Sequence, residues 1–294
     1  MTAPPRLKEG NVVALLAPSG PCDVSRIEPA ARALESFGFR PRIMESCYSC
    51  RGYLAGPDAL RAEDIMKAFA DPSVKGIFNL RGGYGAQRLL PLLDYGLIRK
   101  FPKIFAGYSD ITALHTVLNQ RCGFITYHAP MAGTELYLPD IDDYTLNSFL
   151  DYVLEGRIPP ELSYTSLVPG TAAGILTGGN LSLLVSSLGT PYEINTRDKI
   201  LFMEDVQEIP YRVDRMFTQL KQAGKLKDCR AILLGSFLPE TCDTISQAIE
   251  DILIPLDKPI GVNLPCGHCL PTATLPLGAR VFMDGKTVSA LPAL

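Results

Sequence analysis

Short apolar runs alternate with amphipathic segments in the first half of the chain. The apolar runs, typical of buried strands, lie at residues 11–17, 76–80 and 103–106, and residues 40–44 can form a second strand. Apolar side chains recur near the helical period at residues 26–37, 58–69, 86–93 and 111–119. Strands that alternate with helices of this length favour a parallel sheet covered by helices on both faces.

The elements become less evenly spaced after residue 140. We predict a helix at residues 143–154, a linker in the Gly- and Pro-containing stretch 155–160, and irregular structure at 163–170. Further strands are predicted at residues 173–176, 199–203, 230–234, 259–262, 279–283 and 287–290, and helices at 180–188, 211–223 and 241–252.

This pattern predicts an α/β protein of two domains. Residues 1–140 would form a domain with a Rossmann- or flavodoxin-like parallel sheet, residues 141–164 a linker, and residues 165–294 a more β-rich α/β domain. At 294 residues and 47% apolar composition, the chain is long enough for a large hydrophobic core and is not typical of a disordered protein.

The balance of charged residues argues against two classes of function. The chain has 28 Lys and Arg against 31 Asp and Glu, a net charge of -3, which disfavours nucleic-acid binding and shows no polybasic patch for a membrane surface. No apolar run approaches the roughly 20 residues of a membrane-spanning helix. The first ten residues contain no hydrophobic segment of a secretory signal, so we expect a cytoplasmic protein.

Eight cysteines are then expected to be free thiols. Cys47 and Cys50 form one C-x-x-C pair, and Cys266 and Cys269 form another. Two such pairs suggest a zinc site with four thiolates, but they lie more than 200 residues apart, far outside the usual spacing. We therefore expect no metal and no other cofactor.

A serine stands where a predicted strand turns into a helix. The apolar run ends at Gly107, Ser109 occupies the turn, and Asp110 can cap the following helix. This placement exposes a hydroxyl at the carboxyl edge of a sheet, beside backbone amides that stabilise developing negative charge. The segment is similar to the G-x-S-x-G turn of a nucleophile, except that Ile111 replaces the second glycine. A plain helix cap is the alternative.

The segment Leu80-Arg-Gly-Gly-Tyr-Gly-Ala86 is a second strand-to-helix turn. Its three glycines permit close backbone approach and leave amides available for an oxyanion or a phosphate. The segment is neither a dinucleotide fingerprint nor a P-loop, because no Lys-Ser/Thr pair follows it. A glycine turn with Arg81 paired at the surface is the alternative.

A serine nucleophile needs a base, and the chain has three histidines. His115 falls on the helix after Ser109 and fits a core position. His128 follows a predicted strand and could support the site without touching the nucleophile. His268 lies in a turn-rich loop beyond a strand, where catalytic groups are commonly presented.

An acid that orients the histidine could come from the end of the strand predicted at residues 199–203. Glu204 and Asp205 stand there side by side. A carboxylate can hold one imidazole N–H and thereby fix the tautomer of a catalytic histidine. A solvated carboxylate pair in a loop is the alternative.

Taken together, these segments resemble the LD-carboxypeptidases, serine peptidase family S66, which also includes the microcin C7 self-immunity peptidases. The stretches that carry the resemblance are Arg81-Gly-Gly-Tyr-Gly85, Arg88-Leu-Leu-Pro-Leu-Leu-Asp94, Gly107-Tyr-Ser-Asp110, Gly178-Gly-Asn-Leu181, Phe202-Met-Glu-Asp205, Pro210-Tyr-Arg-Val-Asp-Arg215 and Gly267-His268. They occur in the order found in the family and span nearly the whole chain.

The resemblance implies a Ser–His–Glu triad that hydrolyses an amide bond. Ser109 would be the nucleophile, His268 the general acid and base, and Glu204 the acid that orients His268. The backbone amides of Asp110 and Gly83 would form the oxyanion hole. Because these residues come from both predicted domains, the active site would lie in the cleft between them.

The resemblance also implies a substrate. The expected enzyme acts in peptidoglycan recycling and releases the terminal D-alanine from murein tetrapeptides, by cutting the bond between meso-diaminopimelate and D-Ala. Such peptides carry free carboxylates, which arginine binds bidentately, so Arg81 and Arg215 are candidate substrate ligands. Members of the family are often homodimers, and we expect the same here.

The sequence is also compatible with two other functions. One is the same serine chemistry on a peptidyl-nucleotide, as in microcin immunity, where Tyr and Phe would have to hold the base because the chain has no Trp. The other is a non-catalytic two-domain protein that binds a ligand in its cleft. The motifs of the triad, which occur in the family's order, argue against it.

Overall fold

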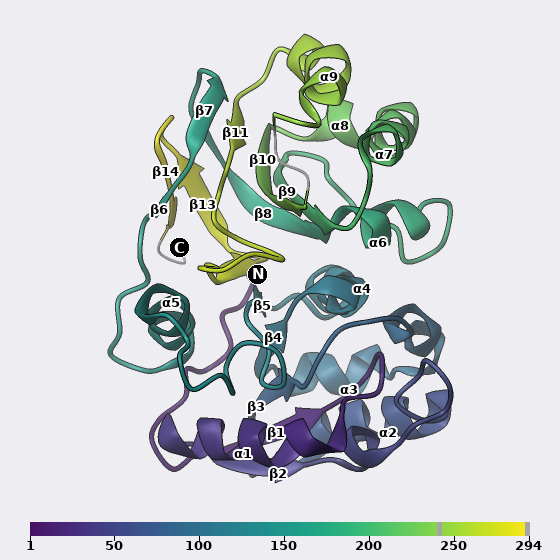
Figure 1. The fold of residues 1–294 in the computed structure, drawn as a ribbon, viewed down its shortest axis with the longest axis vertical. Helices are drawn as coiled ribbons and strands as arrows, with labels where there is room; N and C mark the ends of the chain where they lie inside the picture. The colour runs from purple at the N-terminus through teal and green to yellow at the C-terminus, as the bar shows by residue number, and fades with distance from the viewer. Residues whose placement is uncertain (240–242, 292–294) are drawn as a thin grey trace.

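Two β-sheets, each covered by helices, divide the molecule into an N-terminal and a C-terminal half (Figure 1). The computed structural model describes residues 1–239 and 243–291. The predicted α/β class with two sheets is confirmed. Within the described residues, no helix is both long and apolar enough to cross a membrane.

The N-terminal sheet has the strand order β12-β5-β4-β3-β1-β2, in which β12 is Leu275–Leu277. Its parallel strands are β1 (Val12–Leu16), β2 (Arg40–Ile43), β3 (Val74–Asn79), β4 (Ile104–Gly107) and β5 (Thr126–His128). The order 2-1-3-4-5 is that of flavodoxin-like folds, in which ligands bind at the carboxyl ends of the strands.

Helices cover both faces of this sheet. They are α1 (Ile27–Ser36), α2 (Asp58–Ala70), α3 (Tyr95–Lys100), α4 (Thr112–Val117) and α5 (Asp143–Val153). Alternate residues of β1 enter two separate cores: Ala14 and Leu16 pack with α2, α3 and α4, whereas Val13 and Leu15 pack with α1 and α5. This two-sided burial explains why the inner parallel strands are largely apolar in the sequence, whereas the partly exposed edge strand β2 contains two arginines.

The C-terminal sheet has the order β6-β14-β13-β8-β9-β10-β11-β7. Its parallel centre consists of β8 (Ala172–Asn180), β9 (Lys199–Val206), β10 (Ala231–Leu238) and β11 (Ile260–Val262). The antiparallel outer strands are β6 (Leu162–Ser163), β7 (Thr165–Val168), β13 (Arg280–Met283) and β14 (Thr287–Ala290). The helices of this half are α6 (Leu181–Ser186), α7 (Pro210–Gln222), α8 (Lys225–Asp228) and α9 (Ser246–Ala248).

Three local predictions differ from the structure. Residues 163–170 were expected to be irregular, but β6 and β7 form there because they pair with the distant strands β14 and β11. Residues 86–93 form a 3₁₀ helix, η3 (Ala86–Leu92), with Pro91 inside it. Of the helix expected at 241–252, residues 241 and 242 lie outside the described part, and α9 begins at Ser246.

One strand that the sequence did not indicate links the two halves. β12 (Leu275–Leu277) belongs to the C-terminal part of the chain but pairs antiparallel with β5 of the N-terminal sheet. Just before it, the Thr272 amide donates to Thr145 Oγ1 at 2.8 Å and the Thr274 amide donates to Ser148 Oγ at 2.9 Å, both on α5. The loop that carries His268 therefore ends in a segment fixed to the N-terminal half.

A glycine of β8 is tightly constrained by its neighbour in the sheet. Gly178 has φ +134°, and a Cβ there would overlap the Phe202 carbonyl of β9. We expect Gly178→Ala to lower the free energy of unfolding by about 3 kcal/mol or more, because strained backbone costs about 1–3 kcal/mol and the overlap adds to it.

Gly189 provides a matched control. It also has a positive φ, +76°, but an added Cβ would meet no atom within 4 Å. Gly189→Ala should lower the free energy of unfolding by only about 1 kcal/mol, because the positive φ is its one unfavourable feature. Urea unfolding of both variants measures the difference, and equal losses would contradict the role given to the Phe202 carbonyl.

Candidate functional site

Ser109 lies at the carboxyl end of β4, in a strained turn. β4 ends at Gly107, and Ser109 begins the short 3₁₀ helix η4 (Ser109–Ile111) that leads into α4. Its φ is +65°, a left-handed conformation that costs a non-glycine residue about 1–2 kcal/mol. A strained strand-to-helix turn is the geometry that presents a nucleophile, so the structure agrees with the placement predicted for Ser109.

The glycine loop after β3 packs directly against this turn. A Cβ on Gly82 would lie 2.8 Å from Ser109 Cβ, so only glycine permits this approach. The Gly20 amide donates to the Gly82 carbonyl at 3.1 Å, which fixes the loop from the opposite side. Gly83 follows with φ +113°, also a glycine conformation. The turn at Ser109 and the amides of the glycine loop thus lie together.

Asp110 does not cap the helix that follows it, in contrast to the prediction. Neither η4 nor α4 has a side-chain cap, and the Asp110 carboxylate instead accepts the Ala86 amide at 2.8 Å. Burial raises the pKa of Asp110, although hydrogen bonds from its neighbours oppose this effect. The carboxylate therefore ties the serine turn to the start of η3, and the alternative of a plain helix cap is wrong.

Arg61 supports the glycine loop through its carbonyl groups, a role that the sequence pattern did not predict. Its side chain is fully buried on α2, and its guanidinium donates to the carbonyl of Pro18 and to that of Gly85 at 3.0 Å. Asp58 balances its charge in an ion pair. Arg61 shares the apolar stripe of α2 with Ile65, and a charged residue in such a stripe is a signal that could have identified it.

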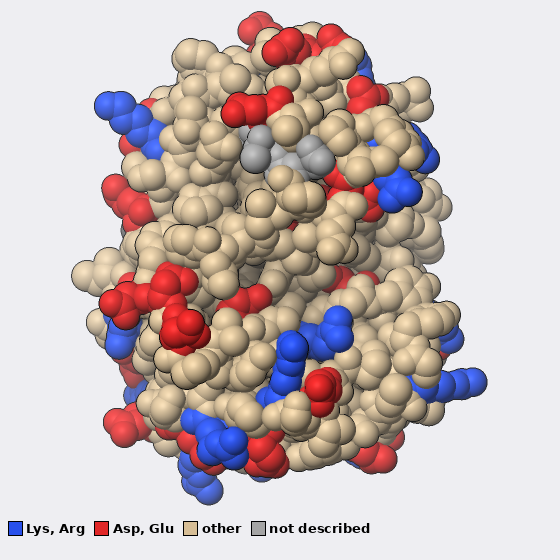
Figure 2. Space-filling view, in the orientation of Figure 1, with Lys and Arg blue, Asp and Glu red and all other residues tan. Residues whose placement is uncertain are grey.

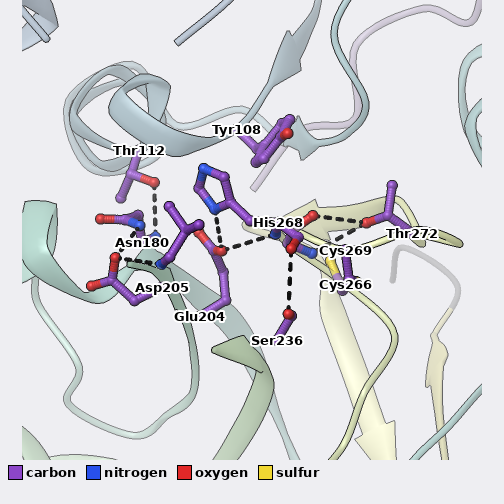
Figure 3. Close-up of polar contacts among 12 residues, drawn as sticks. Tyr108, Thr112, Asn180, Glu204, Asp205, Ser236, Cys266, His268, Cys269 and Thr272 are labelled. Carbon is purple, nitrogen blue, oxygen red and sulfur yellow. Dashed lines mark hydrogen bonds and ion pairs between the residues drawn. The ribbon is translucent and has the colours of Figure 1, made fainter. Parts of the chain in front are cut away.

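Glu204 and His268 contact each other in the C-terminal half (Figure 3). Glu204 is fully buried near the end of β9, and its Oε2 accepts from His268 Nδ1 at 2.7 Å and from the His268 backbone amide at 3.2 Å. A Cβ on Gly267, which has φ +110°, would lie 2.5 Å from the same oxygen. The loop can hold the imidazole against the carboxylate because residue 267 is glycine.

The contact with Glu204 affects both the pKa and the tautomer of His268. Burial lowers the pKa of His268, but the charge and hydrogen bond of Glu204, together with the charges of Asp205 and Glu135, more than offset burial and raise it. Because the carboxylate accepts, Nδ1 carries the proton, and within the described residues Nε2 has no hydrogen-bond partner. The unpaired Nε2 of such an imidazole can accept a proton from a hydroxyl group.

Tyr108 brings the two halves of the site together. Its ring meets the His268 imidazole edge-to-face at a centroid distance of 4.7 Å (Figure 3). The Tyr108 hydroxyl donates to Glu135 Oε1 at 2.7 Å, and Glu135 Oε2 accepts the Met131 amide at 2.9 Å. Tyr108 directly precedes Ser109, so the imidazole contacts the residue next to the serine in the chain. The sequence pattern did not indicate a role for Tyr108 or Glu135.

Asp205, the second carboxylate near the end of β9, has different hydrogen-bond partners from Glu204. Asp205 accepts from Asn180 Nδ2 at 2.9 Å and from the Ser182 hydroxyl at 2.7 Å, so it fixes the start of α6. The Asn180 amide in turn donates to Thr112 Oγ1 of the N-terminal half at 2.9 Å. Of the two predicted alternatives for the acid, only Glu204 contacts His268 among the described residues.

The other two histidines lie in the core. His115 donates from Nε2 to the Gly107 carbonyl at 2.8 Å and accepts from Thr126 Oγ1, so it supports the end of β4. His128 is part of β5 rather than beyond it. Burial lowers the pKa of both imidazoles to about 3, which keeps them neutral.

The two arginines proposed as substrate ligands differ in position. Arg81 adjoins the glycine loop and donates from Nη1 to the Pro21 carbonyl at 2.9 Å. Arg215 lies on the exposed side of α7, with its guanidinium 5.4 Å from the centre of the Tyr211 ring. Figure 2 shows the surface hollowed between the halves, with basic side chains on the N-terminal side of the hollow.

No group of three or more His, Cys, Asp or Glu side chains that could hold a metal occurs within the described residues. Burial raises the pKa of the Cys47 and Cys266 thiols, which keeps them protonated. The site can thus offer a hydroxyl, an imidazole held by a carboxylate, and backbone amides.

Comparison with known proteins places this arrangement in a family. The profiles of the N-terminal and C-terminal domains of LD-carboxypeptidases, peptidase family S66, match residues 13–129 and 173–283. A probable murein peptide carboxypeptidase of Bacillus subtilis is 42% identical over 98% of this chain and 93% of its own length.

Solved structures agree with this result. A muramoyltetrapeptide carboxypeptidase from Oxalobacter formigenes, 32% identical, superposes with a TM-score of 0.84 over 95% of this chain and 97% of its own. An MccF-like protein from Bacillus anthracis, 28% identical, superposes with a TM-score of 0.92 over the whole of both chains. The chain belongs to the LD-carboxypeptidase family of serine peptidases, S66.

Proposed function

We propose that this protein is a serine LD-carboxypeptidase that releases the terminal D-alanine from murein tetrapeptides. The observation that carries the proposal is the 2.7 Å contact between Glu204 and His268, whose imidazole packs on Tyr108, the residue that precedes Ser109. A hydroxyl in a strained turn, an imidazole and an orienting carboxylate are the parts of a catalytic triad.

In the proposed reaction, Ser109 Oγ attacks the carbonyl carbon of the diaminopimelate–D-Ala bond. His268 Nε2 takes the hydroxyl proton, while Glu204 holds the proton on Nδ1 and stabilises the imidazolium. The amides of Asp110 and Gly83 receive the negative oxygen of the tetrahedral intermediate.

The intermediate then collapses in two stages. His268 gives its proton to the nitrogen of the leaving D-alanine, and the peptide remains esterified to Ser109. A water molecule loses a proton to His268 and attacks the ester, which releases the shortened peptide and returns the proton to Ser109.

A carboxypeptidase must also recognise the free carboxylates of its substrate. We propose Arg81 and Arg215 for this role, since guanidinium groups bind carboxylates bidentately. Arg81 has the stronger support because it adjoins the glycine loop, whereas Arg215 already stacks on Tyr211. The names of the B. subtilis and O. formigenes relatives support a murein peptide as substrate. We further propose that the enzyme acts in the cytoplasm in peptidoglycan recycling, as a homodimer.

A second candidate function is hydrolysis of a peptidyl-nucleotide by the same residues. The TM-score of 0.92 with the MccF-like protein favours it. Release of D-Ala from murein tetrapeptide, measured beside release of the nucleotide from a peptidyl-nucleotide, separates the two. A protein that hydrolyses neither substrate fits the third alternative, a binding protein.

Removal of the proposed nucleophile is the first test of this chemistry. We expect Ser109→Ala to abolish D-Ala release, with a loss on the order of 10⁶-fold in kcat, because loss of a triad nucleophile has that size. Ser36→Ala, an exposed serine on α1, is the control and should retain full activity. A Ser109→Ala protein with more than a tenth of the wild-type rate would remove the serine mechanism.

The raised pKa of His268 predicts a pH dependence. A general base works only when unprotonated, so kcat/KM should rise as the pH increases through the pKa of His268. Glu204→Gln removes the carboxylate that raises this pKa, so the rise should move to lower pH. The maximal rate should also fall by about 10²–10⁴-fold, less than for Ser109→Ala, because an orienting residue is lost rather than the nucleophile.

The profile of kcat/KM against pH measures both effects. Glu63→Gln, which removes an exposed carboxylate of α2, is the control for net charge and should leave the profile unchanged. A rise that stays at the same pH in Glu204→Gln, or moves to higher pH, would show that Glu204 does not set the pKa of the base.

A further inference from the structure

We propose that the junction between the two halves holds a second binding site, for a small molecule with a carboxylate head and an apolar body. The site is a cavity of about 540 Å³, within the usual size range of small-molecule pockets. We call it the junction cavity and define it by Arg6, Tyr127, Tyr152, Arg280 and the apolar residues between them. Its ligand is not the substrate, so the proposal goes beyond the function proposed above.

Segments from both halves form the walls of the junction cavity. The N-terminal half contributes residues before β1, on β5 and on α5, and the C-terminal half contributes residues of β8, β12, β13 and β14. The segment before β1 is fixed near both of its ends. The Ile125 amide donates to the Thr2 carbonyl at 3.0 Å, and the Leu7 amide donates to the Val153 carbonyl at 2.7 Å. Backbone pairing therefore holds this wall in place.

The junction cavity and the candidate active site lie on opposite faces of β5. Tyr127 and His128 are successive residues of this strand, so their side chains point to opposite faces. Tyr127 lines the cavity, whereas the His128 ring lies 5.7 Å from the Tyr108 ring, measured between centroids. The strand thus separates a ligand in the cavity from the residues around Ser109.

Two tyrosine hydroxyls at the junction cavity have no partner in the protein. The Tyr127 and Tyr152 side chains are each only 5% exposed, and their ring centroids lie 5.9 Å apart. Within residues 1–239 and 243–291, neither hydroxyl makes a hydrogen bond and neither is sealed from the cavity. Burial raises the pKa of Tyr127 to about 12 and also raises the pKa of Tyr152. Both phenols therefore keep their protons and can donate to a ligand.

The charge around the junction cavity is positive. Arg280 on β13 is exposed and has no ion-pair partner among the described residues. Arg6, whose charge acts on both phenols, donates to the backbone carbonyls of Leu154 and Arg157. In the described part of the chain, no Asp or Glu lines the cavity. Guanidinium groups and phenolic donors together match a carboxylate, which accepts paired hydrogen bonds from arginine.

The rest of the lining is apolar and includes Pro4, Ile125, Ile175, Pro276 and Leu291. Such walls disfavour a sugar or a nucleotide, because hydroxyls and phosphates placed against them would lose water without gaining hydrogen-bond partners. An aliphatic body loses nothing by this transfer and gains from the removal of its surface from water. The ligand class that fits both parts of the cavity is a monocarboxylate with an aliphatic body.

Titration calorimetry with octanoate tests the junction cavity. Octanol lacks the charge of this probe, and acetate lacks its apolar body. We expect octanoate to bind at least on the order of tenfold more tightly than either, because a charge-assisted hydrogen bond has about that effect on affinity. The test does not involve turnover, so its result is independent of D-Ala release.

Two variants and a control locate the bound octanoate. Arg280→Gln should remove the preference for octanoate over octanol. Tyr152→Phe should weaken octanoate binding without lowering the free energy of unfolding, since the hydroxyl makes no hydrogen bond among the described residues. Arg32→Gln, which removes an exposed arginine of α1, is the matched control and should change neither quantity.

Other results would overturn the assignment. No binding of octanoate, or equal affinity for octanoate and octanol, would contradict a carboxylate site. An octanoate affinity that stays the same in both Arg280→Gln and Tyr152→Phe would place the ligand elsewhere. Arg81 is a proposed carboxylate ligand of the active site, so Arg81→Gln separates the two sites. Octanoate affinity that is lost in Arg81→Gln and kept in Arg280→Gln would assign octanoate to the active site.

Discussion

The contact between the Tyr108 ring and the His268 imidazole is the interaction on which the site depends. Tyr108 adjoins the serine turn of the N-terminal sheet, and His268 belongs to a loop of the C-terminal half. Within residues 1–239 and 243–291, neither half contains both a hydroxyl in a strained turn and an imidazole held by an acid. The relative position of the halves therefore sets the geometry of the site.

The structure secures this position on both sides of the His268 loop. Downstream of the loop, β12 pairs with β5, and on the other side Asn180 bonds to Thr112 across the halves. The imidazole itself is held by a carboxylate that is fully buried, and taking a charge out of water is costly unless it is paired. His268 is the partner that the buried Glu204 carboxylate needs. The imidazole is therefore held in place, because separating it from Glu204 would leave a buried carboxylate without this partner.

Much of the fold was predictable because the inner parallel strands are buried on both faces and read as apolar runs, in contrast to the partly exposed edge strand β2. The serine turn and the glycine loop were predictable for a similar reason, since they interrupt regular elements at sheet edges. β12 was not, because its pairing with β5 joins residues about 150 positions apart and leaves no local pattern. β6 and β7 were not predicted for the same reason, because they pair with the distant strands β14 and β11.

The residues that support the site were harder to predict than Ser109, Glu204 and His268, the residues of the proposed triad. Arg61 contacts two loop carbonyls that are distant in sequence, and Glu135 acts through the Tyr108 hydroxyl. Asp110 was expected to cap its own helix but binds the Ala86 amide instead. In each case the partner is set by tertiary packing, which local sequence does not encode.

The central claim is that Ser109 is a nucleophile activated by His268 from the opposite half. Covalent labelling with a fluorophosphonate, followed by peptide mapping, tests it most directly, because only an activated serine reacts rapidly. The account predicts one adduct at neutral pH, on Ser109, and its loss in His268→Ala. An adduct on another serine, no adduct at all, or equal labelling of Ser109 in His268→Ala would contradict it.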